Sequence, residues 1–403
     1  MKIIVIGGGA AGYFAAISAK EGNPSAQVQI FEKTSKVLAK VKVSGGGRCN
    51  VTNATFNNRL LAEKYPRGEK FMRKAFEQFD AQSTVKWFED RKVPLKTYPD
   101  LCIFPESNDS QTIVSLFQTE AYRLGIDVFL YHGVEEIDQV DNGFELTLKD
   151  SKVFANKVIV TVGGQPKSHH LNWIEKLGHR IISPVPSLFT FNMPNEDIKD
   201  LMGIVVEKTK VRIEGKKLIG SGPLLITHWG MSGPAILQLS AWGARILEEL
   251  NYDFSILVNW LDETKEQDLR DQMNLNIKEH GGKMLGNWNP FPFPNRFWSY
   301  LLQKNEIPTS TRWVDLNGKN INKLVNTLIN DRYKVKGKTT FKEEFVTAGG
   351  IDLEEINVNS MESKLCPGLY FAGEVMDIDG ITGGFNFQAA WTTAWIAGKN
   401  AAI

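Results

Sequence analysis

The chain has 403 residues, 42% of them hydrophobic and 23% charged, which is typical of a soluble globular protein with two or three domains. Its 47 Lys and Arg against 46 Asp and Glu leave a formal net charge of +1, which creates no general attraction for nucleic acid or an anionic membrane. We therefore expect a small-molecule substrate, no nucleic-acid partner and no membrane partner.

The three cysteines are few and far apart: Cys49, Cys102 and Cys366. They form neither a disulfide framework nor a CxxC metal site, which fits a reducing compartment. The apolar run at the amino end stops at Gly7, too early for a signal-peptide core or a membrane span. These features predict a cytoplasmic protein.

The first 32 residues have the pattern of a dinucleotide-binding βαβ unit. Ile3–Ile6 is a continuous branched-apolar run, typical of a strand buried on both faces, and an alanine-rich helix from Ala10 to about Lys20 and a second strand, QVQIFE, follow. Three glycines between strand and helix have the G-x-G-x-x-G spacing: Gly7, Gly9 and Gly12. They predict a tight turn, space for a pyrophosphate against the backbone, and close helix–strand packing, with phosphates at the helix N-terminus.

An acidic residue completes this unit. Glu32 lies 20 residues after Gly12, at the end of the second strand, where a carboxylate accepts hydrogen bonds from a ribose diol. It argues against a 2′-phosphate at this site but does not separate NAD from the ADP half of FAD. We prefer a dinucleotide site to a plain structural turn, and we include the neighbouring Ala11 and Lys33 in it.

The carboxyl end favours a flavin dinucleotide. Leu369–Ala372 is a short apolar strand ending in Gly373-Glu374, and a helix from about Phe385 to Ala401 follows a glycine-rich loop. Flavoproteins with two dinucleotide-binding domains end in this way, with the acid on ribitol or pyrophosphate and the helix N-terminus at the flavin pyrimidine edge. A glycine-capped helix alone would not explain the Gly-Glu before it. The backbone N–H groups for the flavin are expected from Gly383, Gly384, Phe385 and Asn386.

Two segments in the middle of the chain fit the same cofactor. Lys157–Gly164, KVIVTVGG, is another buried strand closed by glycines, and it resembles the turn that crosses the cofactor in such enzymes. Thr161 and Gly163 are the candidate contacts there. In the upstream strand YHGVEEI, the backbone of Val134 is a candidate contact for the adenine. We therefore predict FAD as the cofactor.

Four motifs together resemble a known family: SGGGRCNVTN, THWGMSGPAIL, VTAGGI and GLYFAGEVMDIDGITGGFNFQAAW. They resemble the bacterial NAD(P)/FAD-dependent oxidoreductases of the aminoacetone oxidase type, which include bile-acid reductases, and the likeness covers nearly the whole chain. It implies an α/β fold with a discontinuous Rossmann-type, glutathione-reductase-like FAD domain, an inserted antiparallel β domain and a small helical subdomain. The expected boundaries are 1–187 and 341–403 for the FAD domain, 188–260 and 308–340 for the β-rich domain, and 261–307 for the helical subdomain.

In that family the SGGGRCN stretch lies along the flavin. The resemblance implies cofactor contacts from one short region: Lys40, Ser44, Gly45, Gly46, Arg48, Cys49, Asn50 and Thr52. Arg48 would supply a fixed cation. A thiol beside that cation suggests a redox partner of the flavin with a lowered pKa, but with no resolving cysteine nearby we favour a packing role for Cys49.

Two positions depart from the family pattern. Leu101-Cys102 stand where the family has Gly-Arg before a Phe-Pro, and Leu38-Ala39 stand before Lys40 where the family has a glycine. If the missing arginine touches substrate or cofactor in the family, the family's substrate does not carry over to this chain.

The pattern changes between about Ser187 and Phe345. Short alternating runs separated by turn residues predict antiparallel strands. GPAILQLSAWGARILEEL predicts one helix, Asp262–His280 a polar helix, and strand-like sequence returns near Arg312. The aromatic segment Trp288–Trp298 either lines an apolar pocket or, in the simpler interpretation, packs the helical part.

One histidine is the best ionisable candidate on the substrate side. His228, in THWGMSGP, lies between a strand end and a glycine turn, where it can donate a proton or bind a carbonyl oxygen; a hydrogen-bonded structural histidine is the alternative. His169-His170 has no carboxylate or cysteine at ligand spacing, so we expect no metal site.

These observations predict an FAD-dependent oxidoreductase. Hydride passes through flavin N5 between a nicotinamide nucleotide or organic donor and a small organic substrate, an unsaturated carbonyl compound or an amine. Arg48 and His228 are the candidate catalytic residues. Since no second G-x-G-x-x-G occurs, NAD(P)H would bind only transiently. The alternatives are a flavin-containing redox sensor and a tRNA-modifying flavoprotein, the latter disfavoured by the balanced charge.

Overall fold

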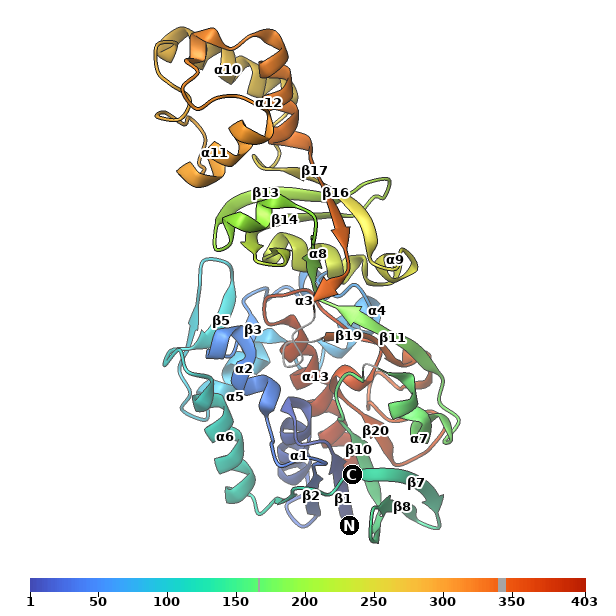
Figure 1. Cartoon of the computed structure of the whole chain (residues 1–403). Coiled ribbons are helices and arrows are strands. Elements are labelled where there is room, and N and C mark those ends of the chain that lie inside the picture. The colour runs from blue at the N-terminus through green and yellow to red at the C-terminus, as the bar shows by residue number, and fades with distance from the viewer. Residues whose placement is uncertain (166, 340–345) are drawn as a thin grey trace. The chain divides into compact units, whose positions relative to one another are not determined.

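The chain is divided into two compact units in the computed structural model, which describes residues 1–165, 167–339 and 346–403. The first unit consists of 1–187 and 341–403, and the second of 188–340 (Figure 1). The second unit is thus inserted in the sequence of the first. The predicted boundary at 340–341 and the predicted return of the chain near Phe345 lie outside the described residues.

The first unit is built on a five-stranded parallel sheet. Its strands, in spatial order, are β20 (Leu369–Phe371), β10 (Lys157–Val160), β1 (Lys2–Ile6), β2 (Gln27–Phe31) and β6 (Asp127–Phe129). Residues 3–6 are buried throughout, as expected for a strand covered on both faces. Because β1, β10 and β20 are parallel neighbours, their carboxyl ends meet at one edge of the sheet. The start, the middle and the end of the chain therefore meet there (Figure 1).

Two helices pack closely against each other in this unit. They are α1 (Ala10–Gly22) and α13 (Phe385–Ala401). Their close approach depends on small residues, since a Cβ at Gly398 would overlap the carbonyl oxygen of Ala15. Phe14 of α1 and Trp391 of α13 pack with ring centroids 5.4 Å apart. The predicted carboxyl-terminal helix is confirmed with its bounds.

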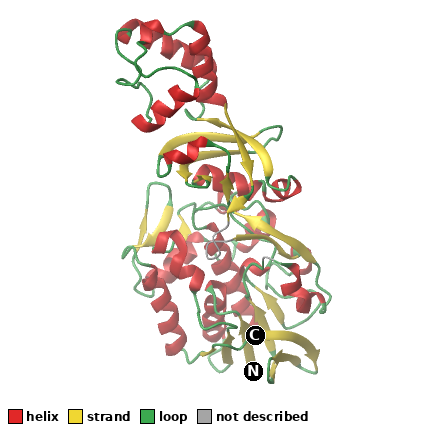
Figure 2. Cartoon of the chain, in the orientation of Figure 1, coloured by secondary structure: helices red, strands yellow, loops and turns green. Residues whose placement is uncertain are grey.

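Smaller sheets and helices surround this core (Figure 2). Three further sheets are formed by β3 (Thr52–Asn53), β5 (Cys102–Pro105) and β4 (Leu95–Thr97); by β7 (Val134–Val140), β8 (Gly143–Leu148) and β9 (Lys152–Ala155); and by β11 (Ile181–Ser187) with β19 (Val346–Ile351). The remaining α-helices are α2 (Ala39–Gly47), α3 (Asn58–Ala62), α4 (Glu69–Ala75), α5 (Ala81–Glu89), α6 (Ser110–Arg123) and α7 (Asn172–Glu175).

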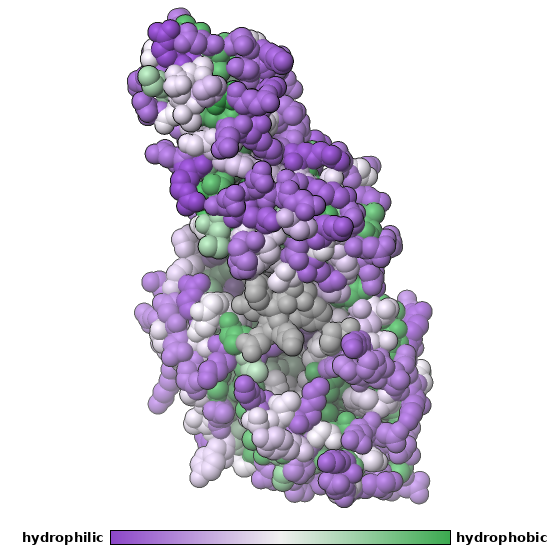
Figure 3. All heavy atoms as spheres, in the orientation of Figure 1, coloured by the Kyte–Doolittle hydropathy of each residue, from purple (hydrophilic) through white to green (hydrophobic). Residues whose placement is uncertain are grey.

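The second unit contains a seven-stranded antiparallel sheet. Its strands, in spatial order, are β17 (Asp331–Lys336), β16 (Asp253–Asn259), β13 (Val205–Ile213), β14 (Ile219–Thr227), β15 (Gly230–Ser232), β12 (Thr190–Asn192) and β18 (Lys338–Thr339). Helix α8 (Pro234–Trp242) packs on β13 and β14. Buried and exposed residues alternate along β13 and β17, as in a sheet with one covered face. The surface visible in Figure 3 is mostly hydrophilic.

The helical part of the second unit differs from the prediction in two places. The sequence predicts one helix over residues 233–250, but it breaks at Gly243 into α8 and α9 (Ala244–Glu249). Strand-like sequence is predicted near Arg312, whereas Gly318–Asn330 form helix α12, which Asn317 caps and whose Leu324, Val325 and Leu328 are buried at helical spacing. The other two helices are α10 (Glu266–His280) and α11 (Asn295–Lys304).

The Rossmann-type fold with an antiparallel insertion, predicted from the sequence, is confirmed by these two sheets. Within the described residues, no helix combines the length and apolar character needed to cross a membrane.

Candidate functional site

The glycine turn after β1 leaves open space at one glycine and none at the other two. No described atom lies within 4 Å of where a Cβ on Gly9 would be. A Cβ on Gly12 would overlap the carbonyl oxygen of Gly7, and one on Gly7 would lie 2.6 Å from the oxygen of Thr161. Gly12 and Gly7 are therefore required for packing, whereas the absence of a side chain at Gly9 leaves room for a ligand.

Thr161, a predicted cofactor contact, braces this turn. Its backbone N–H donates to the oxygen of Ile6 (2.8 Å), and its hydroxyl donates to the oxygens of Ile6 (2.9 Å) and Gly7 (3.0 Å). The side chain is thus engaged by the chain itself. The position of the next predicted contact, Gly163, is open, with no described atom within 4 Å of a Cβ there.

Glu32 lies beside the glycine turn at the end of β2. Its carboxylate accepts from the N–H of Gly8 (2.9 Å) and from the N–H of Thr34 (2.8 Å). The exposed Lys33 follows, and a Cβ on Gly133 would lie 3.1 Å from the Cβ of Lys33. Gly133, the residue before Val134, is therefore next to Lys33.

The SGGG stretch ends helix α2 with an irregular backbone. Gly45, Gly46 and Gly47 have φ values of 57°, 68° and 83°, in the left-handed region that favours glycine. No described atom lies within 4 Å of a Cβ on Gly46 or Gly47, so this backbone faces open space. The hydroxyl of Ser44 donates to the oxygen of Val41 (2.9 Å), which fixes the turn before the glycines.

Arg48 is exposed and held in place by its neighbours. Its guanidinium carbon lies 4.4 Å from the ring centroid of Phe104, and its Nε donates to the oxygen of Gly45 (3.2 Å). A cation stacked on an aromatic ring in this way has a defined position. The predicted fixed cation is therefore available at the end of the glycine stretch.

Residues 50–53 are joined to the beginning of α13 by hydrogen bonds. With its amide oriented to satisfy its neighbours, Asn50 accepts from the N–H of Gly384 (3.1 Å). Asn53 donates to the oxygen of Gly383 (3.1 Å), and the Thr52 hydroxyl donates to Gln388 (2.5 Å). The SGGGRCN stretch and the carboxyl-terminal loop thus form one structure, although over 300 residues separate them in sequence.

The loop before α13 is held by side chains on both sides. Asn386 donates to the oxygen and accepts from the N–H of Gly380 (2.9 Å each), and the hydroxyl of Tyr65 donates to the oxygen of Phe385 (2.7 Å). The first-turn N–H groups of a helix have no partner within the helix. They provide hydrogen-bond donors and a partial positive charge for an anionic or electron-rich ligand.

A second polar cluster lies after β20. Glu374 accepts from Lys40 Nζ (2.8 Å) and from the N–H of Thr347 (2.9 Å). The hydroxyl of Thr347 is buried and has no hydrogen-bond partner among the described residues. A Cβ on Gly164 would lie 2.5 Å from that hydroxyl, so the turn after β10 borders the cluster. An unsatisfied buried hydroxyl beside a carboxylate fits a polar ligand.

Ala11 and Gly373 connect the glycine turn after β1 with the loop after β20. These two regions, with the SGGG stretch and the turn after β10, are here called the cradle. A Cβ on Gly373, whose φ is 77°, would lie 2.8 Å from the Cβ of Ala11. The N–H of Gly373 donates to the hydroxyl of Thr393 (2.9 Å) in α13. The predicted cofactor residues at the two chain ends are therefore neighbours.

Cys49 is fully buried, and burial raises the pKa of its thiol to about 12. The idea of a low-pKa redox thiol at this position is not supported, and the packing interpretation fits the geometry. At the departure from the family pattern, Leu101 is exposed with φ 65°, a conformation that favours the family's glycine. Cys102 is buried in β5, and burial raises the pKa of its thiol to about 11.

Sequence reasoning missed a buried ion pair that involves the loop before α13. Asp379 is fully buried and pairs with Arg67, and the hydroxyl of Ser187 donates to its carboxylate (2.6 Å). Burial raises the pKa of the Asp379 carboxyl, and the Arg67 charge opposes that shift. No local signal links these residues, because Arg67 and Asp379 lie 312 positions apart.

His228, the candidate proton donor, belongs to the second unit. It is exposed in the turn between β14 and β15, with its ring centroid 4.3 Å from that of Trp229. The aromatic segment packs the helical part instead of lining a pocket, since Phe291, Phe293 and Trp298 are all buried. His169 and His170 are exposed, with ring centroids 4.4 Å apart.

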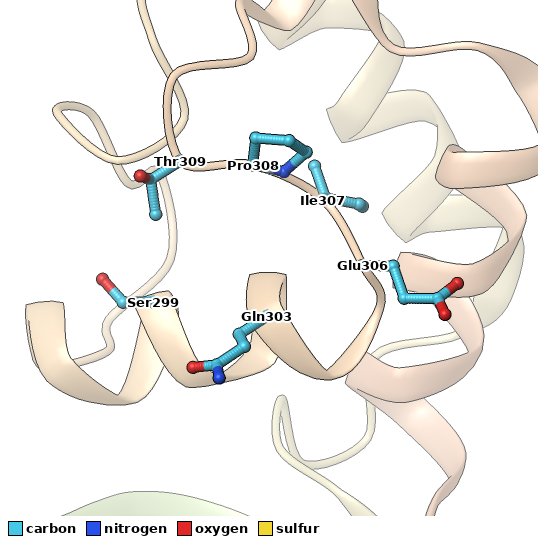
Figure 4. A pocket seen from close by; sticks show the side chains of 6 residues that line it. All are labelled: Ser299, Gln303, Glu306, Ile307, Pro308 and Thr309. Atoms are coloured by element: carbon cyan, nitrogen blue, oxygen red, sulfur yellow. The ribbon is translucent and has the colours of Figure 1, made fainter.

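A cleft of about 390 Å³ lies between α11 and the loop after it (Figure 4). Its lining residues are Ser299, Gln303, Glu306, Ile307, Pro308 and Thr309. It is open to solvent and contains none of the predicted site residues, so the glycine-lined cradle of the first unit is the better candidate site.

The residues of this cradle fit FAD. The open positions at Gly9, Gly46 and Gly163 leave the backbone accessible, and the unsatisfied hydroxyl of Thr347 lies beside Glu374. The ADP half would be held by the glycine turn and Glu32, and the flavin half by Lys40, Glu374 and the N-terminus of α13.

Comparison with known proteins agrees with this cradle. Residues 1–400 match the family described as HI0933-like protein Rossmann domain. A 3-dehydro-bile acid delta(4,6)-reductase from Clostridium scindens is 25% identical over 100% of this chain and 99% of its own. A ribosomal RNA dihydrouridine synthase from Escherichia coli is 30% identical over 98% and 97%.

Solved structures show the same fold. A 3-ketosteroid delta1-dehydrogenase from Sterolibacterium denitrificans superposes with a TM-score of 0.51 at 12% identity, covering 99% of each chain. An E. coli quinol fumarate reductase superposes with a TM-score of 0.50 at 15% identity, covering 100% of this chain and 70% of the other. The chain belongs to the HI0933-like family, a Rossmann-type family of FAD-dependent oxidoreductases.

Proposed function

We propose that the protein is an FAD-dependent reductase that saturates a carbon–carbon double bond conjugated to a carbonyl group, with NADH or NADPH as the electron donor. The observation that supports it is the end-to-end match to two curated relatives with different names, a bile-acid delta(4,6)-reductase and a dihydrouridine synthase. A 3-dehydro steroid with a double bond at position 4 is a conjugated ketone. Dihydrouridine is uridine whose ring double bond, conjugated to a carbonyl, has been reduced. Reduction of a double bond conjugated to a carbonyl group is therefore the chemistry that both names share.

In this reaction the double bond gains a hydride and a proton. FAD, when bound and reduced, supplies the hydride equivalent, which originates from NAD(P)H. The residues of the chain would hold the cofactor, with the open backbone at Gly9, Gly46 and Gly163 against it. When FAD is bound, the N-terminus of α13 would stabilise negative charge on the reduced ring, which would raise the electron affinity of the flavin.

The proton and the carbonyl require polar groups. We propose His228 as the proton donor, because its ring is exposed and no described hydrogen bond occupies its nitrogens. We propose Arg48 as the cation that polarises the substrate carbonyl, since stacking on Phe104 fixes its position at the glycine stretch. His228→Gln is then expected to lower kcat by about 10²-fold or more.

The experiment is an anaerobic titration followed by a substrate panel. The purified yellow protein is titrated with NADH and NADPH separately, and loss of visible absorbance identifies the donor. The reduced protein is then mixed anaerobically with a conjugated dienone steroid and with uridine-containing RNA. As the control, the oxidised protein is mixed with a primary amine and oxygen, and oxidation of the amine is measured. Reoxidation by either conjugated substrate, with the saturated product found by mass spectrometry, supports the proposal. Turnover of the amine alone contradicts it.

A second, more specific candidate places the double bond in RNA. Two relatives, at 30% and 26% identity and 96% or more of their own lengths, are named ribosomal RNA dihydrouridine synthase. The net charge of +1 argued for no nucleic-acid partner, but a local cationic surface suffices for RNA binding. Dihydrouridine in RNA from the reaction, measured after digestion to nucleosides, tests this form of the proposal.

The redox-sensor alternative loses its main support. Its natural output was the thiol of Cys49, which is buried and whose pKa is raised by burial. A protonated, inaccessible thiol reacts slowly with oxidants.

A further inference from the structure

We infer that the solvent face of the antiparallel sheet in the second unit binds RNA through its phosphates. The inference rests on the RNA form of the proposed function. The surface, here called the cationic sheet face, is formed by six residues on two strands: Lys208, Lys210 and Arg212 of β13, and Arg332, Lys334 and Lys336 of β17.

The strand register puts these six side chains on one side. Arg212 pairs with Leu257 of β16, and Leu257 pairs with Arg332. Residues paired in this way point to the same face, and residues two positions along a strand do so as well. The intervening residues of β13 and β17 are buried on the opposite face, so the cations point to solvent.

The spacing allows the six charges to act together. Alternate residues along a strand lie about 7 Å apart, and two strands separated by one other lie about 10 Å apart. Both distances are comparable to the screening length of about 8 Å at physiological ionic strength. The positive potentials of neighbouring side chains therefore add, whereas isolated surface lysines are screened from one another.

Carboxylates neutralise this surface only in part. The four strands β13, β14, β16 and β17 and the β13–β14 turn carry eight solvent-facing cations, the six above with Lys216 and Lys217. They carry three exposed carboxylates, Glu207, Glu214 and Asp253, and Glu263 in the loop after β16 pairs with Lys210 (3.0 Å), so eight cations face four carboxylates. The chain as a whole is balanced, so this excess of positive charge is local.

The existing ion pairs are of the kind that a phosphate can replace. Arg332 pairs with Glu214 (2.8 Å), Lys334 with Asp253 and Lys210 with Glu263 (3.0 Å), and all six side chains are at least 33% exposed. Exposed pairs contribute little to stability and are screened by salt. RNA supplies a regular series of negative charges, so charge complementarity favours it as the occupant of this surface.

The test compares two triple variants with the same loss of charge. Lys208→Gln/Lys210→Gln/Arg212→Gln removes one row of the cationic sheet face. Lys86→Gln/Lys152→Gln/Lys176→Gln removes three lysines of the first unit, whose side chains are 76%, 58% and 66% exposed. Binding of a labelled, single-stranded ribosomal RNA fragment is measured by fluorescence anisotropy over a range of salt concentrations. Visible absorbance of the flavin checks that each variant is folded.

The expected result differs between the variants. The sheet-face triple should bind RNA at least about tenfold more weakly, and its log–log salt slope should fall in magnitude by about 2, since each lost phosphate contact on a single strand removes about 0.7. The control triple should bind within about twofold of the original protein. Glu214→Gln should strengthen binding, because the carboxylate no longer competes for Arg332.

Other outcomes overturn the inference. If the two triple variants bind RNA equally well, the cationic sheet face does not bind RNA. The same conclusion follows if the sheet-face triple loses binding to anionic lipid vesicles but keeps its binding to RNA. Flavin reduction by NAD(P)H and turnover of the dienone should be unchanged in the sheet-face triple, so a failed RNA result leaves the proposed reductase intact. Normal RNA binding without reduction of any conjugated double bond contradicts the proposed function instead.

Discussion

Two regions of the molecule present opposite kinds of surface to a ligand. One is the carboxyl edge of the parallel sheet in the first unit, and the other is the open face of the antiparallel sheet in the second. At the parallel edge, glycines leave space, and the backbone is available because no side chain covers it at Gly9 or Gly46. On the antiparallel face, long charged side chains project into solvent from alternating positions of β13 and β17. An edge lined by bare backbone suits a cofactor held permanently, and an open charged face suits a partner that binds and leaves.

The largest expected effect separates two glycines of one motif. Gly12→Val should not give folded protein, because its Cβ overlaps the backbone oxygen of Gly7, and the cost exceeds the usual overpacking penalty of about 1–3 kcal/mol. Gly9→Val should fold, since its φ of −88° is an ordinary one and no described atom lies near the new Cβ. It should nevertheless be colourless, because the side chain takes the space of the pyrophosphate.

Circular dichroism and the absorbance of the bound flavin measure both variants. A yellow Gly9→Val protein with full flavin occupancy would place the phosphates elsewhere. A folded Gly12→Val protein would show that the helix can move away from β1.

The next effect compares a buried ion pair with an exposed one. Asp379→Ala leaves the Arg67 guanidinium without its buried partner and should lower the free energy of unfolding by about 3–5 kcal/mol. Asp253→Ala removes the partner of Lys334 on the cationic sheet face, where both side chains are exposed, and should leave the urea midpoint nearly unchanged.

A double variant separates charge from packing. Arg67→Met/Asp379→Leu replaces both charges by apolar side chains and should recover much of the loss. If Asp379→Ala is as stable as the original protein, Arg67 has found solvent or another partner, and the pair does not hold the loop before α13.

The sequence predicted those parts of the first unit that follow local rules. The continuous apolar run at Ile3–Ile6, the glycine spacing and the alanine-rich helix each determine their own structure, and the Rossmann-type fold is confirmed. The sequence also predicted that distant segments share one cofactor, but not their individual hydrogen bonds, since Asn50 meets Gly384 and Thr347 meets Glu374 only through the tertiary fold.

In the second unit, alternation predicted strands but not their order. The cationic sheet face exists because β16 lies between β13 and β17, and no local pattern specifies that neighbour. Helix α12 was not predicted: strand-like sequence was expected near Arg312 and residues 308–340 were assigned to the β-rich domain, although Leu324, Val325 and Leu328 have helical spacing.

A smaller effect contrasts two histidines. His179 of the first unit is buried, with Nε2 2.9 Å from the Ser363 hydroxyl and Nδ1 3.1 Å from Glu355, and burial lowers its pKa although Glu355 opposes the shift. The unfolded chain then binds a proton that the folded chain resists, so stability is lost as the pH falls below about 6.5. His228 is exposed at a turn, and its replacement should not alter that loss.

Urea midpoints at pH 7.5 and 5.5 measure this contrast. His179→Gln should show a smaller decrease between the two pH values than the original protein, whereas His228→Gln should show the same decrease. Equal decreases in all three proteins would assign the acid sensitivity to carboxylates.

The last prediction is that the Cys49 thiol hardly reacts in the folded protein. With its pKa raised to about 12, the Cys49 thiol is ionised to roughly 1 part in 10⁴ at pH 8, against roughly a quarter for an unperturbed thiol. Its labelling by a disulfide reagent should therefore be more than about 10³-fold slower than that of a cysteine introduced at the exposed Ser221 of β14, and fast only after unfolding. Mass spectrometry of the labelled peptides assigns each rate. Rapid labelling of Cys49 in the folded protein would mean that the SGGGRCN stretch opens to solvent. A redox role for this thiol would then again be physically reasonable.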